Sequence, residues 1–236
     1  MRYVIFNADD FGASLGINRG IVDCHRHGVV TSASLMVTGR AVHEAVALSR
    51  DCPALSLGLH WDVWGEDERE FDLRDLGNVE EELDRQVDAF HRLVGRLPTH
   101  IDSHRHAHLE EVVRDCFLAK AGALCVPVRG DGRVQFIGGF YAQWEWKVTT
   151  LEHVSVSALQ RILAAEIGEG WTEVSCHPGY VSPDYQAVYL EEREAEVKTL
   201  TDPRVRRSIE DLRIGLKSYA EFPALKYPEG GGSRHD

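Results

Sequence analysis

Hydrophobic and polar positions follow two different spacings along this chain. Short apolar runs of strand length lie at residues 3–6, 30–36, 54–60, 99–102, 125–129 and 172–176. Segments with apolar or charged residues at helical spacing lie between or after them, at residues 16–27, 42–49, 78–94, 157–167 and 190–216. Strands that alternate with helices are typical of a mainly parallel β/α architecture. We therefore predict an α/β fold.

The segment 78–94 has the clearest helical pattern. Its apolar side chains recur every three or four positions, at Val79, Leu83, Val87, Phe90 and Val94. Asn78 is placed to cap its first turn, and Gly95 is placed to end it. We expect Gly28 and Pro53 to end the two earlier helices in the same way.

Two long stretches follow neither spacing, residues 61–75 and residues 130–146. The first is rich in acidic residues and tryptophan, and the second is rich in glycine and aromatic residues. Irregular segments of this length inside a compact domain often carry function. We predict one domain over residues 1–226, followed by a glycine-rich tail, residues 227–236, that is disordered.

Composition narrows the class of protein. A chain of 236 residues that is 43% hydrophobic can bury one α/β core. A net charge of −12 and a pI near 5.4 argue against a nucleic-acid or anionic membrane partner, because phosphate binding needs clustered Lys and Arg. Five cysteines without a C-x-x-C pair favour neither a disulfide framework nor a cysteine zinc site. No leader-like segment or apolar run of membrane length is evident, so we expect a cytoplasmic protein without a membrane span.

Polar clusters follow four of the predicted strands. Asp9 and Asp10 follow the first strand, His60 ends the third, "DSHRHAH" at 102–108 ends the fourth, and "CHPGY" at 176–180 ends a late one. The active site of a parallel β/α fold lies at the carboxyl ends of its strands. Ends so far apart in sequence converge only if the sheet is closed or strongly curved, which favours a barrel-like sheet.

Each cluster also has a simpler explanation. An aspartate after a strand can cap the next helix, which is worth about 1 kcal/mol. A single histidine such as His60 is more often a core or surface residue, and His177 before a proline fits a turn. In an extended segment, alternate residues point the same way, so His104, His106 and His108 would present their imidazoles together. The coincidence of all four clusters at strand ends favours a metal site.

One aspartate and two histidines form a ligand set that suits hydrolytic metal chemistry, because positions stay open for water and substrate. The metal lowers the pKa of its bound water and polarises a carbonyl oxygen. A second carboxylate beside the ligands is placed to take the proton of that water, and a further histidine can protonate the leaving group. The residues therefore point to a metal-dependent hydrolase.

Several motifs, in order from residue 2 to about residue 220, carry a resemblance to a known family. They are "NADDFG", "TSASLMV", "LGLHW", "PTHIDSHRHAH" and "SCHPGY". Together they resemble the YdjC-like carbohydrate deacetylases, the family of the ChbG chitooligosaccharide deacetylases and the hopanoid-associated HpnK proteins. The resemblance implies a distorted β/α (TIM-like) barrel of the polysaccharide-deacetylase kind that binds one divalent metal ion.

The resemblance also implies roles for individual residues. The metal ligands would be Asp10, His60 and His104, the catalytic base Asp9, and the acid that protonates the departing amine His177. The implied reaction removes the acetyl group of an N-acetylhexosamine unit as acetate. The family is associated with Mg²⁺, whereas the ligand set suits Zn²⁺ or a similar ion. A homodimer is the default state for such enzymes.

Further residues around the implied site have open roles. We expect Asp102, His106 and His108 to contact either the substrate or the side chains that bind the metal. Asp102 is a candidate partner that fixes the tautomer of a histidine. Arg129 could orient Asp9, hold the acetyl oxyanion, or be an ordinary surface arginine. Four tryptophans either stack on sugar or anchor loop packing, namely Trp61, Trp64, Trp144 and Trp146.

The segment after the third strand departs from the chitooligosaccharide enzymes, because it is short and acidic where a longer insertion is expected. Its acids are Glu66, Asp67, Glu68, Glu70 and Asp72. A different N-acetylated sugar, or one carried on a lipid or nucleotide, is therefore an alternative substrate. Rival classes are a phosphoesterase, a cyclic amidohydrolase, and a carbohydrate- or metal-binding protein without catalysis.

Overall fold

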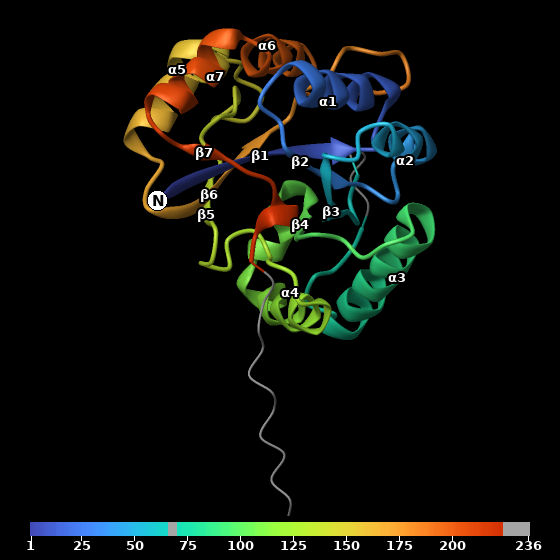
Figure 1. The fold of residues 1–236 in the computed structure, drawn as a ribbon. Helices are drawn as coiled ribbons and strands as arrows, with labels where there is room; N and C mark the ends of the chain where they lie inside the picture. The colour runs from blue at the N-terminus through green and yellow to red at the C-terminus, as the bar shows by residue number, and fades with distance from the viewer. Residues whose placement is uncertain (66–69, 224–236) are drawn as a thin grey trace, which may run out of the picture.

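The computed structural model describes residues 1–65 and 70–223, and they form a parallel sheet with helices on both sides (Figure 1). The strands are β1 (Arg2–Phe11), β2 (Ser32–Leu35), β3 (Ser56–Trp61), β4 (Ile101–Ser103), β5 (Gln135–Ile137), β6 (Gly170–Cys176) and β7 (Gly215–Leu216). Their order is β4-β3-β2-β1-β6-β5, with β7 beside β1, and every pairing is parallel. The predicted α/β class is confirmed. The predicted tail, residues 227–236, lies outside the described residues.

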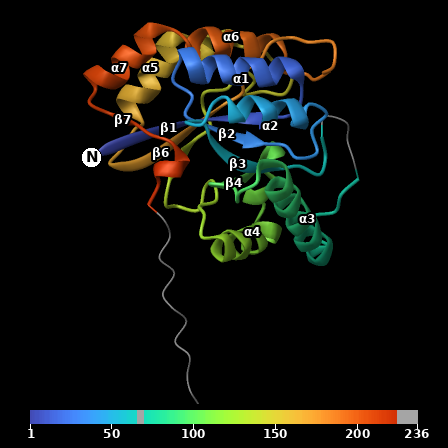
Figure 2. The same ribbon diagram turned by 45° about the vertical axis from the view of Figure 1, so that its right-hand side comes forward.

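The helices gather in two groups, as Figure 2 shows from a second side. They are α1 (Leu15–His27), α2 (Val42–Arg50), α3 (Leu76–Val94), α4 (Glu111–Leu124), α5 (Val156–Ala165), α6 (Glu191–Leu200) and α7 (Pro203–Asp211). Helices α1, α5, α6 and α7 lie on one side of the sheet, and α3 and α4 lie on the other. Apolar side chains of both groups join the sheet in one core, in which Phe6, Ile21 and Phe90 are fully buried.

The sheet curves into a half-barrel with β4 and β5 at its edges, and residues 127–129 lie beside β4. The backbone carbonyl of Ile101 accepts from Arg129 N–H at 3.0 Å, and Ile101 N–H donates to the carbonyl of Pro127 at 3.0 Å. We predicted a strand at 125–129, and this was wrong: only a single bridge pairs Ile101 with Val128. Pro127 lacks the N–H that a longer ladder needs. The next strand, β5, falls instead inside the stretch that we predicted to be irregular.

Helix boundaries differ from the sequence prediction in three places. Helix α3 begins earlier, because the side chain of Asp75, rather than Asn78, caps it by accepting the Asn78 N–H at 3.2 Å. Gly95 ends it with φ +81°, as predicted. Helix α4 was missed, and the single helix predicted at 190–216 is two helices, because Asp202 and Pro203 start α7. In the described ranges, no helix is both long and apolar enough to cross a membrane.

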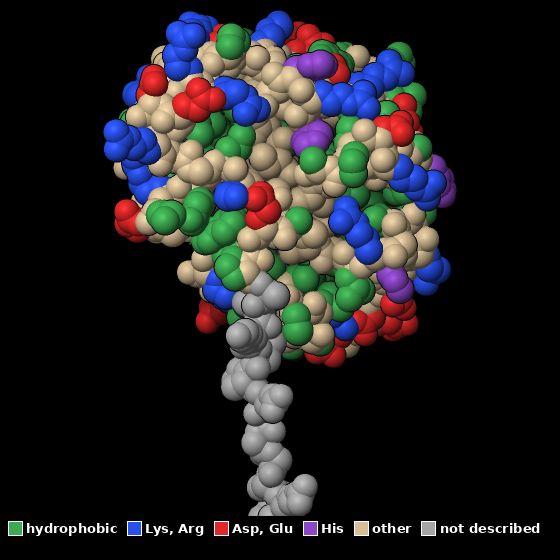
Figure 3. Space-filling model, in the orientation of Figure 1, with side chains coloured by type: hydrophobic (Ala, Val, Ile, Leu, Met, Phe, Trp, Pro, Cys, Tyr) green, Lys and Arg blue, Asp and Glu red, His purple; other side chains and the backbone are tan. Residues whose placement is uncertain are grey.

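On the face seen in Figure 3, basic and acidic side chains are interspersed, and the basic ones do not form a continuous patch. The exclusion of nucleic acid as a partner stays a prediction from the net charge.

Candidate active site

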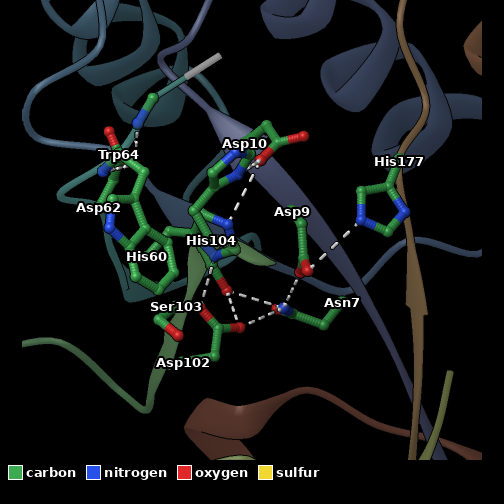
Figure 4. Close-up of polar contacts among 12 residues, drawn as sticks. Asn7, Asp9, Asp10, His60, Asp62, Trp64, Asp102, Ser103, His104 and His177 are labelled. Atoms are coloured by element: carbon green, nitrogen blue, oxygen red, sulfur yellow. Dashed lines mark hydrogen bonds and ion pairs between the residues drawn. The ribbon is translucent and has the colours of Figure 1, made fainter. Parts of the chain in front are cut away.

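Strand β1 contains two adjacent aspartates, Asp9 and Asp10, and its pairing with β2 is irregular where they lie. The register with β2 shifts between Ala8 and Phe11, and Asp10 has φ +67°. A regular strand would point neighbouring side chains to opposite faces, but a bulge redirects one of them. A non-glycine residue in this conformation costs about 1–3 kcal/mol, and such strain clusters at functional sites. The bulge brings both Asp9 and Asp10 into the same buried cluster (Figure 4).

Three side chains from three strand ends converge on one point. Oδ1 of Asp10 lies 3.3 Å from Nε2 of His60 and 3.3 Å from Nδ1 of His104. His60 comes from β3, and His104 directly follows β4. The donor atoms of the three residues lie within 4.8 Å of one another. One oxygen and two imidazole nitrogens at this spacing form a donor set that fits a divalent transition ion.

The second nitrogen of His60 is fixed by Asp102. Nδ1 of His60 lies 2.7 Å from Oδ1 of Asp102, as in metal-binding histidines whose outer nitrogen meets a carboxylate. Burial lowers the pKa of His60, but Asp102 and Asp10 outweigh it and raise the pKa well above its usual value. The same attraction that favours a proton on the imidazole would favour a metal cation beside it.

Arg129 holds Asp9 in a two-point contact. Its Nη1 donates to Oδ2 of Asp9 at 2.8 Å, and its Nη2 donates to Oδ1 at 2.6 Å. Burial raises the pKa of Asp9, but Arg129 more than offsets this and the pKa is lowered overall, so the carboxylate is ionised at neutral pH. The guanidinium is 1% exposed and also contacts Asp102 and Glu173. Among the roles considered for Arg129, this geometry matches orientation of Asp9 and excludes a surface position.

The charges of this buried cluster suit a divalent cation. Four carboxyl groups meet two guanidinium groups, namely Asp9, Asp10, Asp102 and Glu173 with Arg129 and Arg193. Buried carboxylates need compensation by cations or hydrogen bonds. The pKa values of Asp9, Asp10 and Asp102 are lowered and burial raises that of Glu173, so three carboxylates face two guanidinium groups and the cluster keeps a negative charge that favours a cation.

His177 stands on the opposite side of Asp9 from the proposed ligands (Figure 4). It follows β6, and its Nε2 lies 3.7 Å from Oδ2 of Asp9. Burial lowers the pKa of His177 to about 4, so the imidazole is neutral at pH 7 before substrate binds. The arrangement thus places one carboxylate between a candidate metal site and a neutral imidazole.

These groups line a cavity of about 690 Å³, a size usual for small-ligand sites. Polar members of its wall include Asp9, Asp10, His60, His104, His106 and His177. Aromatic and apolar members include Tyr141, Trp146, Val188 and Tyr189. Carboxylates and imidazoles thus share one cavity with aromatic and apolar side chains, a mixture that suits a sugar derivative.

The histidine triplet is not the extended segment that we expected. Residues 104–109 form a 3₁₀ segment in which Arg105 and His106 have φ of +52° and +54°. His106 still lines the cavity, with its ring against Phe136. His108 instead turns into the core, where its Nδ1 lies 2.7 Å from Oγ of Ser103. It is absent from the cavity wall, so a substrate contact for His108 is not supported.

Three of the four tryptophans considered above are absent from the cavity wall. Trp61 is fully buried, and its ring meets Phe117 at 5.2 Å, so the prediction that it contacts sugar is wrong and the packing alternative holds. Trp144 is exposed but stacks on His153 at 3.7 Å and does not line the cavity. Trp64 packs against the core. Trp146 is the tryptophan found in the wall.

Helix α6 supplies site residues that sequence reasoning missed. Nη2 of Arg193 donates to Oδ2 of Asp10 at 2.7 Å. Burial raises the pKa of Asp10, but Arg193 and the neighbouring imidazoles hold the pKa well below its usual range. Glu196 accepts a hydrogen bond from the backbone of His177. A run of charged residues such as "EEREAEVK" is typical of a solvated helix, so no sequence signal distinguished these two.

The chain is similar in sequence to known proteins over almost its whole length. The family model described as "YdjC-like protein" matches residues 3–211. A chitooligosaccharide deacetylase of Serratia marcescens is 30% identical, with 94% of this chain and 99% of the relative aligned. A carbohydrate deacetylase of Geobacillus stearothermophilus is 33% identical, over 95% of this chain and 99% of the relative.

Solved structures share the fold. An Enterococcus faecalis protein described as a cellobiose-phosphate cleavage protein has a TM-score of 0.82 at 25% identity, covering 95% of this chain and 99% of its own. The polysaccharide deacetylase of Bacillus cereus has a TM-score of 0.60 at 12% identity, with both chains fully covered. The predicted polysaccharide-deacetylase type of fold is thereby confirmed. Because the family model matches most of this chain, the chain belongs to the YdjC-like protein family.

Proposed function

We propose that this protein is a metal-dependent carbohydrate deacetylase that removes the acetyl group from an N-acetylhexosamine unit. The observation that carries the proposal is the order of groups across one cavity. A donor set of Asp10, His60 and His104 lies on one side of Asp9, and His177 lies on the other. This order fits amide hydrolysis, which needs an activated water, a base and a proton donor for the amine.

Asp10, His60 and His104 would hold the metal ion. When bound there, a divalent ion would supply a water molecule of lowered pKa and a polarised acetamide carbonyl. The chain's own contribution is to keep the donors aligned: Asp102 fixes the ring of His60, and Arg193 fixes the second oxygen of Asp10. Mg²⁺ by family resemblance and Zn²⁺ by ligand type are both candidates.

Asp9 acts as the base. Arg129 keeps its carboxylate ionised and fixes its plane, so that it can take a proton from the attacking water. Its Oδ2 also faces His177, at 3.7 Å from Nε2. Because the imidazole is neutral beforehand, we propose that the proton taken at Asp9 Oδ2 passes to His177 Nε2 and then to the departing amine nitrogen. The C–N bond breaks, and acetate and a free amine leave.

The cavity favours a sugar amide over a phosphate ester. Arg129 and Arg193 are each already bonded to carboxylates, which weakens their attraction for a phosphate. The aromatic side chains of Tyr141 and Trp146 provide faces on which a sugar ring can stack.

The position of Asp9 favours an enzyme over a binding protein. Asp9 is not among the proposed metal ligands, and a protein that only binds its ligand does not need a base there. His106 lines the same cavity and would contact the substrate. A homodimer and a cytoplasmic location stay predictions.

The decisive experiment combines metal analysis with acetate release. Purified protein is loaded with Mg²⁺ or Zn²⁺ and tested on N-acetylglucosamine, its oligomers, and lipid- or nucleotide-linked N-acetylhexosamines. We expect one metal ion per chain and acetate from at least one substrate. Asp9→Asn should keep the metal and release no acetate, whereas His104→Ala should lose both. Stoichiometric metal with no acetate from any of these substrates would favour the binding-protein or phosphoesterase alternatives.

A further inference from the structure

The imidazole of His177 lacks the partner that usually fixes a catalytic histidine. In many enzymes the outer nitrogen of such a ring bonds to a carboxylate or carbonyl, which sets its orientation. Among the described residues, Nδ1 of His177 is buried and has no hydrogen-bond partner. The orientation of the His177 ring toward Asp9 must therefore be set by contacts to the backbone of His177 or to the faces of its ring.

The backbone of His177 is bound by Glu196 of helix α6. The N–H of His177 donates to Oε2 of Glu196 at 2.5 Å. Arg193, one helical turn earlier, donates through Nη1 to the carbonyl of His177 at 3.4 Å. Both polar groups of this peptide segment are thus tied to α6, just after β6 ends.

The ring of His177 abuts a pair of stacked tyrosines. Tyr141 and Tyr189 stack at 4.5 Å with an angle of 7° between planes. The ring centroid of His177 lies 5.3 Å from that of Tyr141 and 5.9 Å from that of Tyr189, both at steep angles. The hydroxyl of Tyr189 donates to Oε1 of Glu196 at 2.5 Å. Glu196 is therefore the group that joins the backbone of His177 to the aromatic support of its ring.

Glu196 occupies an unfavourable place for a carboxyl group. It is fully buried, and within the described ranges no cation lies at salt-bridge distance from it. Burial raises its pKa to about 8 even though it accepts two hydrogen bonds. An apolar residue would be more stable in such surroundings, so its retention calls for a role in the site.

We propose that Glu196 is the positioning residue for His177, holding its imidazole toward Asp9 through the His177 N–H and the Tyr189 hydroxyl. The inference rests on the proposed function, in which His177 carries the proton to the departing amine. It assigns to α6 a part in the proton transfer in addition to its contact with Asp10.

Two substitutions separate the length of the Glu196 side chain from its acidity. Glu196→Gln keeps the length, with the amide oxygen accepting the His177 N–H and the amide nitrogen donating to Tyr189. Glu196→Asp keeps the carboxyl group but is one methylene too short to reach both partners. We expect Glu196→Asp to lower kcat by about 10²-fold with little change in KM, as for a misplaced catalytic group, and Glu196→Gln to stay within about threefold of the wild type.

A second readout does not depend on deacetylation. In protein labelled with ¹⁵N-histidine, the His177 signals are identified by their loss in His177→Asn. We expect the two ring nitrogens to keep their wild-type shifts in Glu196→Gln and to move in Glu196→Asp. If the wild type releases no acetate but these shifts respond as stated, the proposed function fails while the positioning role stands.

Thr199→Val serves as the matched control on the same helix. Thr199 is buried and donates to the carbonyl of Val154 at 2.6 Å, outside the cavity. We expect this variant to lose some stability with kcat and the His177 signals unchanged. The proposal is overturned if Glu196→Asp leaves kcat and the His177 signals as in the wild type, or if Thr199→Val changes them equally.

Discussion

Removing the charge of Asp102 should weaken metal binding although Asp102 is not a proposed ligand. Its two oxygens receive donors from different sides. Oδ1 faces Nδ1 of His60 at 2.7 Å, and Oδ2 accepts from Ser34 at 2.6 Å, from Asn7 at 3.2 Å and contacts Arg129 at 2.8 Å. An N–H₂ group in place of Oδ2 would face the donors on that side, and one in place of Oδ1 would force the His60 ring into its other tautomer.

The expected loss of metal affinity follows from the two orientations that the amide of Asp102→Asn can take. If the amide nitrogen faces His60, the ring must accept at Nδ1 and carry its proton at Nε2, which removes the lone pair offered to the metal. If it faces the other side, it opposes the Ser34 hydroxyl and the guanidinium of Arg129. Loss of such an outer partner typically costs about 10–100-fold in metal affinity, or roughly 1.4–2.7 kcal/mol.

The assay is isothermal titration of Zn²⁺ or Mg²⁺ into chelator-treated protein. Ser34→Ala is the matched control, because it removes one hydrogen bond to the same carboxylate and leaves His60 and Asp102 unchanged. We expect its dissociation constant to stay within about threefold of the wild type, well below the range for loss of the outer carboxylate. An Asp102→Asn protein that folds normally and binds metal as tightly as Ser34→Ala would refute the assigned role of the His60–Asp102 contact.

Three further outcomes follow from packing, the cavity wall and a buried acid. Trp61→Ala should lower the free energy of unfolding by about 3–5 kcal/mol in urea titrations, because the indole is fully buried against Phe117; a loss under 1 kcal/mol would contradict core packing. Trp146→Ala should raise KM several-fold in the acetate assay, whereas Trp144→Ala, outside the cavity, should not; equal effects would remove the stacking role. The folded pKa of Glu196 is raised to about 8 from 4.5, so its stabilising contribution is complete below about pH 4.5 and is lost as pH rises through 8. Unfolding at pH 6 and pH 9 should therefore show a smaller decline in Glu196→Gln than in the wild type, and identical declines would argue against a neutral buried Glu196.

The sequence allowed the strands and most proposed site residues to be located because both depend on simple rules. Apolar runs located β1, β2, β3 and β6, and parallel topology brings their carboxyl ends together. Asp10, His60 and His104 meet for that reason, although their positions in the chain are far apart. The strand predicted at 125–129 failed because its pairing with β4 ends after one bridge, which the apolar pattern does not reveal.

Buried charge is the part that pattern reading could not supply. In α6 the charged residues predict a solvated surface, yet Arg193 and Glu196 turn inward to Asp10 and His177. A periodic pattern reports only which residues are polar. Whether a polar side chain is buried depends on whether a polar partner, here Asp10 or the backbone of His177, lies on the inner side of the helix. The orientation of His108 was missed for a related reason, since left-handed backbone at Arg105 and His106 replaces the extended geometry that the spacing assumed.

The adjacent aspartates of β1 depend both on irregular backbone and on buried charged partners. In a regular strand Asp9 and Asp10 would point apart, and one of them would be lost to the site. The register shift and the positive φ of Asp10 bring both into the cluster, and different guanidiniums then distinguish them. Arg129 takes both oxygens of Asp9, while Arg193 takes only Oδ2 of Asp10 and leaves Oδ1 facing the two imidazoles. Two identical side chains thus acquire the separate characters of a base and a ligand from their partners, so a substitution of either arginine should affect one aspartate and largely spare the other.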